Sequence, residues 1–371
     1  MTCDLLSLAP DNIRSLQPYR PGKPIEELER ELGIPDIVKL ASNENPLGPG
    51  PMAREAVARY IGELGRYPDG NGFVLKQKIA AHLSIAPEML TLGNGSNDVL
   101  ELVARVFASR EHEILFSEHA FAVYPLVTQA VGARGVVVPA MDFGHDLSAM
   151  LTAVTPRTRV IFIANPNNPT GTWTTSAALD TFLQTVPDTV LVVVDEAYRE
   201  YVDHPDYPDC VAWLSRYPNL IVTRTFSKIH GLAGLRIGYA ISHPDTADLL
   251  NRVRQPFNVN SMALAAATAA LEDTDHLRQS KHLNDAGYRQ LTAAFGELGL
   301  EYIPSVGNFI TVHVGRNGEE IYDHLLKQGV IVRLIGNYAL PHHLRVTIGL
   351  EPENTKFIRA LEHSLAQTSS V

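Results

Sequence analysis

Short apolar runs recur through the middle of the chain, separated by longer amphipathic stretches, and this pattern predicts alternating strands and helices. The run Leu191–Val194 shows no polar alternation, which indicates a strand buried on both faces, as in a parallel sheet with helices on each side. We therefore expect a large α/β domain over residues 52–260, built on a mostly parallel sheet. The predicted strands are Met89–Leu92, Glu113–Phe116, Gly135–Val138, Val160–Ala164, Leu191–Val194, Leu220–Thr223 and, as a seventh, Leu235–Ile241.

The two ends of the chain differ from this alternating middle. Eight of the 24 prolines precede Met52, which predicts an N-terminal arm over residues 1–51 rather than a layered domain. One short helix is expected in the arm over Pro24–Leu32, with Pro24 at its first position and Gly33 at its end. Residues 261–371 predict a smaller α+β domain, against which we expect the arm to pack. Its expected elements are an Ala-rich helix, helices at Asp275–Leu298 and Gly318–Gln328, strands at Asn308–Val314, Val330–Arg333 and Leu344–Ile348, and a last helix.

Charge and composition exclude several classes of partner. The chain has 31 Lys+Arg against 41 Asp+Glu, a formal net charge of −10, and an acidic chain lacks the basic face that nucleic acids and anionic membranes require. No apolar run approaches the ~18 residues of a membrane span, and the N-terminus lacks the basic start of a signal peptide, so we expect a cytoplasmic protein. Cys3 and Cys210 are too few for a disulfide framework, and the 14 histidines form no ligand-spaced cluster, so no metal site is expected.

The candidate chemistry follows the predicted strands, because ligands of open parallel sheets bind beyond the carboxyl ends of the strands. Gly93–Asp98 is a Gly-rich turn that we expect to open a helix near Val99, where free N–H groups can hold a phosphate. Asp195 ends a buried strand and needs a partner. Arg224–Lys228 places a lysine beside hydroxyl groups, with Arg236 nearby. Each feature alone is equally compatible with a structural turn, a helix cap or a surface lysine.

Together these features match the needs of pyridoxal 5′-phosphate. Its aldehyde needs a lysine, its pyridine nitrogen a carboxylate, its ring oxygen donors, and its phosphate N–H groups with an arginine. Other chemistries have less support. A Rossmann fingerprint at Gly93–Asp98, with Glu118 as the ribose acid, lacks its third glycine, and no nucleophile elbow or P-loop is present. A zinc motif that begins at His112 has Phe116 in place of its second histidine.

Several segments from the arm to the last predicted strand carry a family resemblance: Lys39–Gly48, Arg66–Pro68, Asn168–Gly171, Asp195–Tyr198, Thr225–Lys228, Gly231–Tyr239 and Leu344–Gly349. On these segments the chain resembles the fold-type I aminotransferases, which depend on pyridoxal 5′-phosphate, and within them the histidinol-phosphate aminotransferase family. The resemblance covers nearly the whole chain.

This resemblance implies a role for each matching residue. Lys228 is implied as the Schiff-base lysine and general base, and Asp195 as the partner of the pyridine nitrogen. Asn168 and Tyr198 are implied as donors to the ring oxygen, and Phe121 as the ring that stacks on the cofactor. The implied phosphate contacts are Ser96, Asn97, Thr225, Ser227 and Arg236, with Tyr67 reaching the cofactor of the neighbouring subunit of an obligate homodimer; the implied substrate contacts are Tyr19, Arg333 and Arg345.

The implied activity is transamination between histidinol phosphate and 2-oxoglutarate in histidine biosynthesis. Arg345 suits a phosphate or a carboxylate equally, whereas Arg333 adds a second positive charge that favours a phosphate dianion. Three alternatives stay open: an aminotransferase for aromatic amino acids, a lyase similar to threonine-phosphate decarboxylase, and a binding-only regulator with the same fold. The presence of Lys228 disfavours the regulator.

Overall fold

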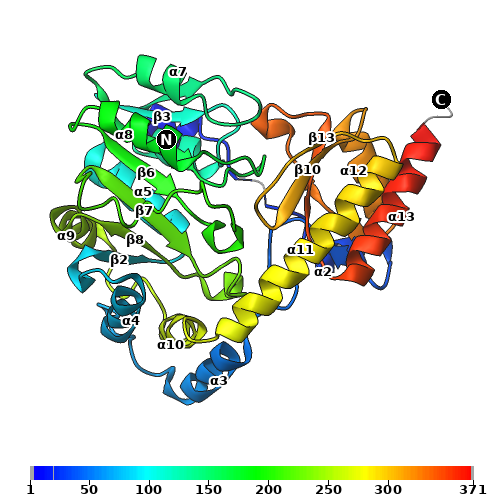
Figure 1. The fold of residues 1–371 in the computed structure, drawn as a ribbon, viewed down its shortest axis with the longest axis horizontal. Coiled ribbons are helices and arrows are strands. Elements are labelled where there is room, and N and C mark those ends of the chain that lie inside the picture. The colour runs from blue at the N-terminus through cyan, green and yellow to red at the C-terminus, as the bar shows by residue number, and fades with distance from the viewer. Residues whose placement is uncertain (1–3, 20, 369–371) are drawn as a thin grey trace.

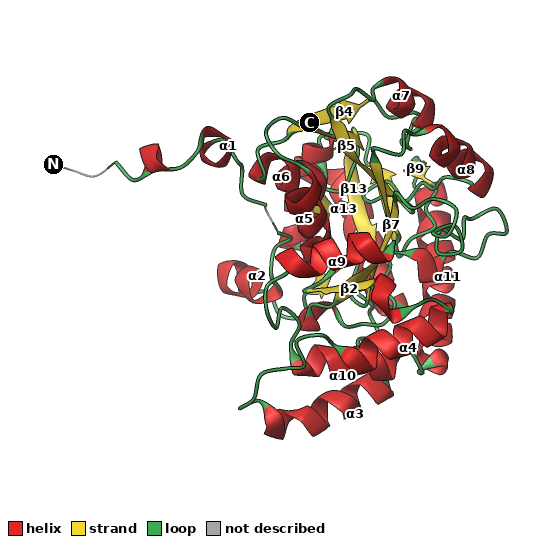
Figure 2. Cartoon of the chain, turned by 90° about the vertical axis from the view of Figure 1, so that its left-hand side faces the viewer, coloured by secondary structure: helices red, strands yellow, loops and turns green. Residues whose placement is uncertain are grey.

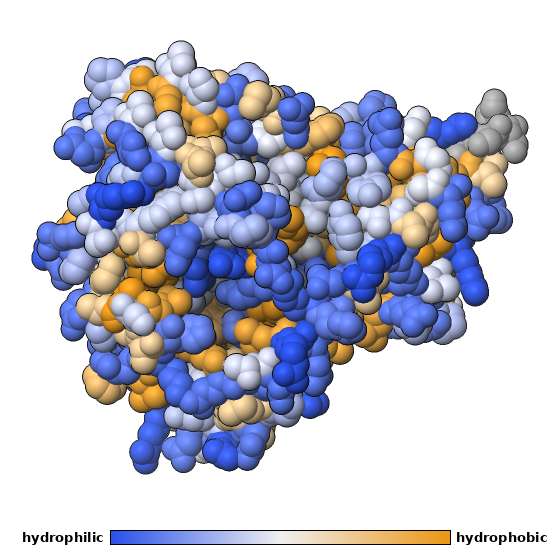
Figure 3. Space-filling view, in the orientation of Figure 1, coloured by the Kyte–Doolittle hydropathy of each residue, from blue (hydrophilic) through white to orange (hydrophobic). Residues whose placement is uncertain are grey.

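The computed structural model describes residues 4–19 and 21–368, in which the two larger sheets with their helices lie side by side (Figure 1). Cys3 and the outermost residues of the predicted ranges 1–51 and 261–371 lie outside the described residues. No helix within the described ranges is both long and apolar enough to cross a membrane. Figure 3 shows a mainly polar face with smaller apolar areas, as is usual for a protein surface in water.

The larger sheet has seven strands. They are β2 (Leu90–Gly93), β3 (Glu113–Ser117), β4 (Arg134–Val138), β5 (Thr158–Ala164), β6 (Leu191–Asp195), β7 (Leu220–Thr225) and β8 (Gly238–Ser242). Their order is β2-β8-β7-β6-β5-β3-β4, in which β8 runs antiparallel to both its neighbours and the other pairs are parallel. The predicted α/β class with a mostly parallel sheet is confirmed. The predicted seventh strand begins three residues later than expected, at Gly238.

Apolar side chains cover both faces of this sheet, as the unbroken run at residues 191–194 predicts. Within β5, Val160 and Phe162 belong to one buried cluster, and Ile161 and Ile163 belong to another. The two clusters lie on opposite faces because successive side chains of a strand alternate. Figure 2 shows helices on both sides of the sheet. The first cluster contains residues of α5 (Ser96–Phe107), α6 (Val123–Ala130) and α9 (Pro244–Val253); the second contains residues of α3 (Pro51–Tyr60), α4 (Phe73–Leu83), α7 (Leu147–Thr152), α8 (Ser176–Thr185) and α10 (Ser261–Ala270).

The smaller sheet is antiparallel and lies against three helices. Its strands are β9 (Tyr302–Ile303), β10 (Phe309–His313), β12 (Arg333–Leu334) and β13 (His343–Thr347), in the order β12-β13-β10-β9. The helices are α11 (Thr274–Glu297), α12 (Gly318–Lys327) and α13 (Glu351–Thr368). Phe295, Ile310 and Phe357 belong to the buried cluster that joins the sheet to these helices. Figure 1 shows α11 running from the end of α10 to the smaller sheet.

The arm contributes α1 (Asp11–Arg14), α2 (Ile25–Leu32) and β1 (Val38–Lys39). The prediction of Pro24 inside the helix is wrong by one residue, because Pro24 keeps an extended ψ of 150° and α2 begins after it. Gly33 ends α2 with a φ of 63°, as predicted. The single strand predicted at residues 330–333 is also wrong. Its first half, β11 (Val330–Ile331), pairs in parallel with β1 of the arm, while Arg333 begins β12 of the smaller sheet.

Candidate active site

A cavity of about 240 Å³ lies at the carboxyl ends of the central parallel strands and reaches to the smaller sheet. Residues 41–44 of the arm line one side of it. Of the residues predicted from the sequence as cofactor or substrate contacts, only Tyr67 lies outside this cavity. Those that line it are Tyr19, Ser96, Asn97, Phe121, Asn168, Asp195, Tyr198, Thr225, Ser227, Lys228, Arg236, Arg333 and Arg345.

One end of the cavity is suited to an anion. Helix α5 begins at Ser96, three residues earlier than the start predicted near Val99, so Ser96 and Asn97 belong to its first turn, whose N–H groups have no helical partner. Gly95, with a φ of 84°, precedes the helix, and a Cβ atom there would lie 2.3 Å from Nη2 of Arg236. The glycine therefore allows the guanidinium to approach the start of α5. Across from it, the Thr225 hydroxyl donates to Ser227 Oγ at 3.0 Å.

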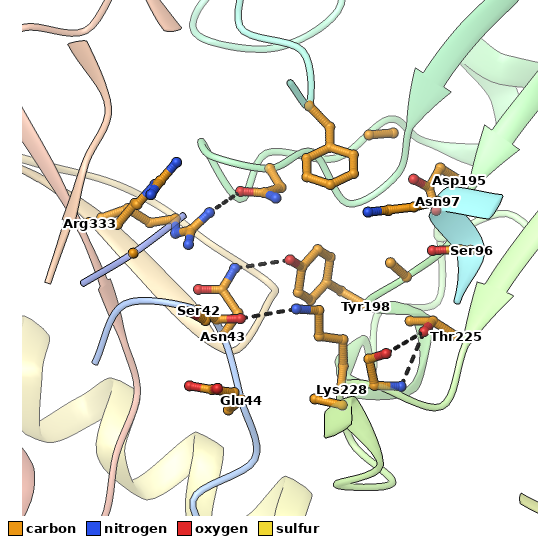
Figure 4. Close-up of a pocket in the computed structure, with 18 of the residues that line it drawn as sticks. Ser42, Asn43, Glu44, Ser96, Asn97, Asp195, Tyr198, Thr225, Lys228 and Arg333 are labelled. Carbon is orange, nitrogen blue, oxygen red and sulfur yellow. Dashed lines mark hydrogen bonds between the residues drawn. The ribbon is translucent and has the colours of Figure 1, made fainter. Parts of the chain in front are cut away.

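Asp195, 5% exposed, lines the same cavity at the end of β6 and lies near Asn97 in Figure 4. Its Oδ1 accepts a hydrogen bond from Thr223 Oγ1 and its Oδ2 accepts one from Tyr124 OH, both at 3.0 Å. Burial raises the pKa of Asp195 to about 6, and the two hydroxyl donors oppose that rise. Among the described residues no basic nitrogen forms an ion pair with it. A cationic ligand group is the partner that this carboxylate lacks.

Lys228 also projects into the cavity (Figure 4). Its Nζ donates to the carbonyl of Ser42 at 3.1 Å and lies 5.5 Å from the centre of the Tyr198 ring. Burial, with the positive charge of Arg345 as the next cause, lowers the pKa of Lys228 from 10.5 to about 7. About half of this amine is therefore neutral at pH 7, which a nucleophile or general base requires.

The arm supplies a group that the sequence predictions did not assign. Asn43, with a φ of 55°, donates from Nδ2 to the hydroxyl of Tyr198 at 2.9 Å. Its Oδ1 accepts from the Thr347 hydroxyl, and its own N–H donates to that hydroxyl. Burial raises the pKa of Tyr198 to about 12, so the phenol stays protonated and can donate to a ligand oxygen. Asn43 lies within a segment that resembles the family, yet sequence position gave no indication of its contact with Tyr198.

Two arginines of the smaller sheet line the side of the cavity that lies across from the larger sheet. Arg345, 6% exposed, donates to Asn168 Oδ1 at 2.5 Å and to the carbonyl of Ala41 at 2.6 Å, and its Nε has no hydrogen-bond partner among the described residues. The guanidinium of Arg333 lies 5.4 Å from the centre of the Tyr19 ring. Figure 4 shows Arg333 on the far side of the cavity from Asp195. This side can receive the anionic end of a substrate whose reacting nitrogen lies near Lys228.

Tyr67 lies away from the cavity of its own chain. It is 84% exposed and stacks on Phe257, with ring centres 4.8 Å apart. Its contact with a neighbouring subunit therefore stays a prediction.

The residues present fit pyridoxal 5′-phosphate. Lys228 offers an amine, Asp195 a carboxylate with no cationic partner among the described residues, Asn168 and Tyr198 polar groups in the same cavity, and the start of α5 with Arg236 an anion site. Within the described parts of the chain, no group of three or more His, Cys, Asp or Glu side chains is arranged to hold a metal ion.

The comparisons with known proteins agree with this chemistry. Residues 35–361 match the family model of class I and II aminotransferases. The chain is 61% identical to histidinol-phosphate aminotransferase 1 of Nitrosococcus oceani, covering 97% of both chains. It is 57% identical to histidinol-phosphate aminotransferase 2 of Pseudomonas aeruginosa, covering 98% of this chain and 99% of the relative.

Solved structures share the fold. The histidinol-phosphate aminotransferase of Sinorhizobium meliloti, in complex with pyridoxal 5′-phosphate, has a TM-score of 0.90 at 30% identity, covering 96% of this chain and 97% of that one. Aspartate aminotransferase of Thermus thermophilus has a TM-score of 0.83 at 18% identity, covering 96% of this chain and 99% of that one, which shows the fold alone. The chain therefore belongs to the class I and II aminotransferases and, within them, to the histidinol-phosphate aminotransferase family.

Proposed function

We propose that this protein is a pyridoxal 5′-phosphate-dependent histidinol-phosphate aminotransferase, which interconverts histidinol phosphate and 2-oxoglutarate with imidazole-acetol phosphate and glutamate in histidine biosynthesis. The observation that carries the proposal is the Lys228 amine, which lies in a cavity between the Asp195 carboxylate and two arginines. The identity of 61% to a histidinol-phosphate aminotransferase over nearly the whole chain supports the choice of substrate.

The chemistry divides between the cofactor and the protein. When bound, pyridoxal 5′-phosphate supplies an aldehyde that joins amines covalently and a protonated pyridine ring that accepts electrons. Asp195 would bind the pyridine nitrogen and favour its protonated form, because a buried carboxylate is stabilised by a cation. Once free, Lys228 can remove the proton from the substrate carbon next to nitrogen and return it, since its pKa is about 7.

The two arginines support a phosphorylated substrate. Arg345 is pre-ordered by Asn168 and the carbonyl of Ala41, and it can turn an N–H group to an anion. Arg333 lines the same cavity and brings a second positive charge to it. A phosphate monoester carries up to two negative charges near neutral pH, whereas a carboxylate carries one, so the pair of arginines favours the phosphate.

We further propose that the protein acts as a cytoplasmic homodimer. Large apolar side chains gather near the end of α3 and the start of α4. Ile61, Leu64, Tyr67, Phe73 and Val74 are each between 59% and 84% exposed in the single chain. A second copy of the chain would remove this apolar surface from water. The family resemblance implies that Tyr67 would then lie beside the cofactor phosphate of that copy.

Comparison of kcat/KM for histidinol phosphate, phenylalanine and threonine phosphate, with CO₂ release followed in parallel, tests the function. We expect the highest value for histidinol phosphate and no CO₂. A higher value for phenylalanine would instead establish an aromatic aminotransferase, and CO₂ release from threonine phosphate would establish a decarboxylase. Sedimentation of the purified protein tests the dimer. A monomer at the enzyme's working concentration would contradict the proposal.

A further inference from the structure

The carboxylate of Asp195 is held by two hydroxyl groups, one on each oxygen. Thr223 is the neighbouring residue on the paired strand β7, and its hydroxyl donates to Oδ1. Tyr124 comes from helix α6, 71 residues away in sequence, and its hydroxyl donates to Oδ2. The carboxylate therefore has no freedom to rotate without breaking one of these two bonds.

Tyr124 is itself fixed by aromatic packing. Its ring is fully buried, stacks on Phe162 with centres 4.7 Å apart and an angle of 10°, and meets Phe121 edge to face at 5.9 Å. Phe121 in turn lines the cavity. The packing leaves the Tyr124 hydroxyl one position, directed at Asp195.

The Tyr124 hydroxyl can act only as a donor to this carboxylate. Burial, and then the negative charge of Asp195, raise the pKa of Tyr124 well above its usual value, so the phenol keeps its proton. A donor stabilises the ionised carboxylate, and hydrogen bonds from Thr223 and Tyr124 both oppose the rise that burial causes in the pKa of Asp195. Two charged groups act on Asp195: Glu196 favours its protonation, and the Lys228 amine, which lines the same cavity, interacts with its negative charge.

We propose that Tyr124 is a positioning residue for the cofactor: its hydroxyl keeps the Asp195 carboxylate ionised and directed into the cavity, and so decides whether a bound pyridine nitrogen carries a proton. The proposal rests on the proposed function, because it requires the pyridine ring of pyridoxal 5′-phosphate to face Asp195. The Asp195 carboxylate and the pyridine nitrogen compete for one proton. Without the Tyr124 hydroxyl, the buried carboxylate would bind that proton more strongly, and the nitrogen would be protonated less.

The position of this proton can be measured without turnover. The holoenzyme is prepared with pyridoxal 5′-phosphate labelled with ¹⁵N in the ring, and its ¹⁵N chemical shift separates protonated from unprotonated pyridine. We expect a protonated nitrogen in the wild type, and in Tyr124→Phe a shift toward the unprotonated form. We also expect the dissociation constant of the cofactor to rise about tenfold or more, as for loss of a hydrogen bond to a charged group.

Two further variants separate proton position from packing. Phe121→Leu removes an aromatic neighbour of Tyr124 but no hydroxyl, so it should weaken cofactor binding while the nitrogen stays protonated. Thr223→Val removes the donor to Oδ1 and should shift the nitrogen signal in the same direction as Tyr124→Phe, which keeps the test available if Tyr124→Phe fails to fold. A wild-type nitrogen signal in Tyr124→Phe, or in Thr223→Val if Tyr124→Phe does not fold, would overturn the proposal. Absence of any cofactor at Lys228 in the wild type would instead overturn the proposed function.

Discussion

The lowered pKa of Lys228 predicts how the protein captures its cofactor as pH changes. Only the neutral amine attacks an aldehyde. An ordinary lysine with a pKa of 10.5 has about one neutral molecule in 3,000 at pH 7, whereas a pKa of about 7 leaves about half neutral, roughly a thousandfold more. We expect the capture rate to rise with pH, to be half-maximal near pH 7, and to level off at higher pH.

Two charged residues have the largest charge effects on the pKa of Lys228, and these effects have opposite signs. Replacing each of them tests whether the pKa moves in the expected direction. Arg345 lowers the pKa of Lys228, so Arg345→Gln should move the midpoint to higher pH. Glu44 raises that pKa, so Glu44→Gln should move the midpoint to lower pH. The two variants serve as matched controls for each other, because both replace a charge by the same neutral amide.

Rapid mixing of the protein, freed of cofactor, with pyridoxal 5′-phosphate measures the capture rate through the change in absorbance. The midpoint is read from the rate at saturating cofactor between pH 5.5 and 9.5, which separates it from any change in affinity. A midpoint near 10 in the wild type, or shifts of the same sign in both variants, would refute the electrostatic account of Lys228.

Three further predictions concern substrate, stability and assembly. Arg333→Ala should lower kcat/KM for histidinol phosphate more than for a carboxylate substrate such as glutamate, and equal losses would remove the reason for assigning Arg333 to the phosphate. Glu196→Ala should lower the free energy of unfolding by about 3–5 kcal/mol in urea, because it leaves the mostly buried guanidinium of Arg224 without the carboxylate to which it donates; Asp275→Ala, at an exposed ion pair, should change it by less than about 1 kcal/mol. Tyr67→Phe should weaken cofactor binding in the dimer without changing its sedimentation, and an unchanged cofactor affinity would contradict the role proposed for Tyr67.

The sequence predicted the central strands well for a physical reason. Strands β5 and β6 are buried on both faces, so selection for apolar residues leaves an unbroken run that stands out against the amphipathic helices. The direction of β8 could not be predicted, because its apolar pattern is the same for parallel and antiparallel pairing. The two-residue strand β1 is too short to show a period, and its partner β11 lies almost 300 residues away.

The site divides in the same way. Groups that follow directly from strand ends, such as Asp195 and Lys228, were predicted because the topology of a parallel sheet brings those ends together. Tyr124 was missed because it lies within a helix and its contact with Asp195 depends on how α6 packs on the sheet. A sequence signal that could have indicated it is its spacing of three residues from Phe121, which precedes α6 and accepts a turn hydrogen bond from the Tyr124 N–H.

The location of the cofactor bond is the claim on which the account depends. Reduction of the yellow holoenzyme with borohydride makes that bond permanent, and peptide mass spectrometry identifies the lysine. Lys228 is the predicted site. Lys76 is a demanding internal control, because it is also buried and its pKa is lowered to about 8, yet it lies outside the cavity. Label on Lys228 with none on Lys76 agrees with the account; label on Lys76 or on any other lysine in place of Lys228 contradicts it.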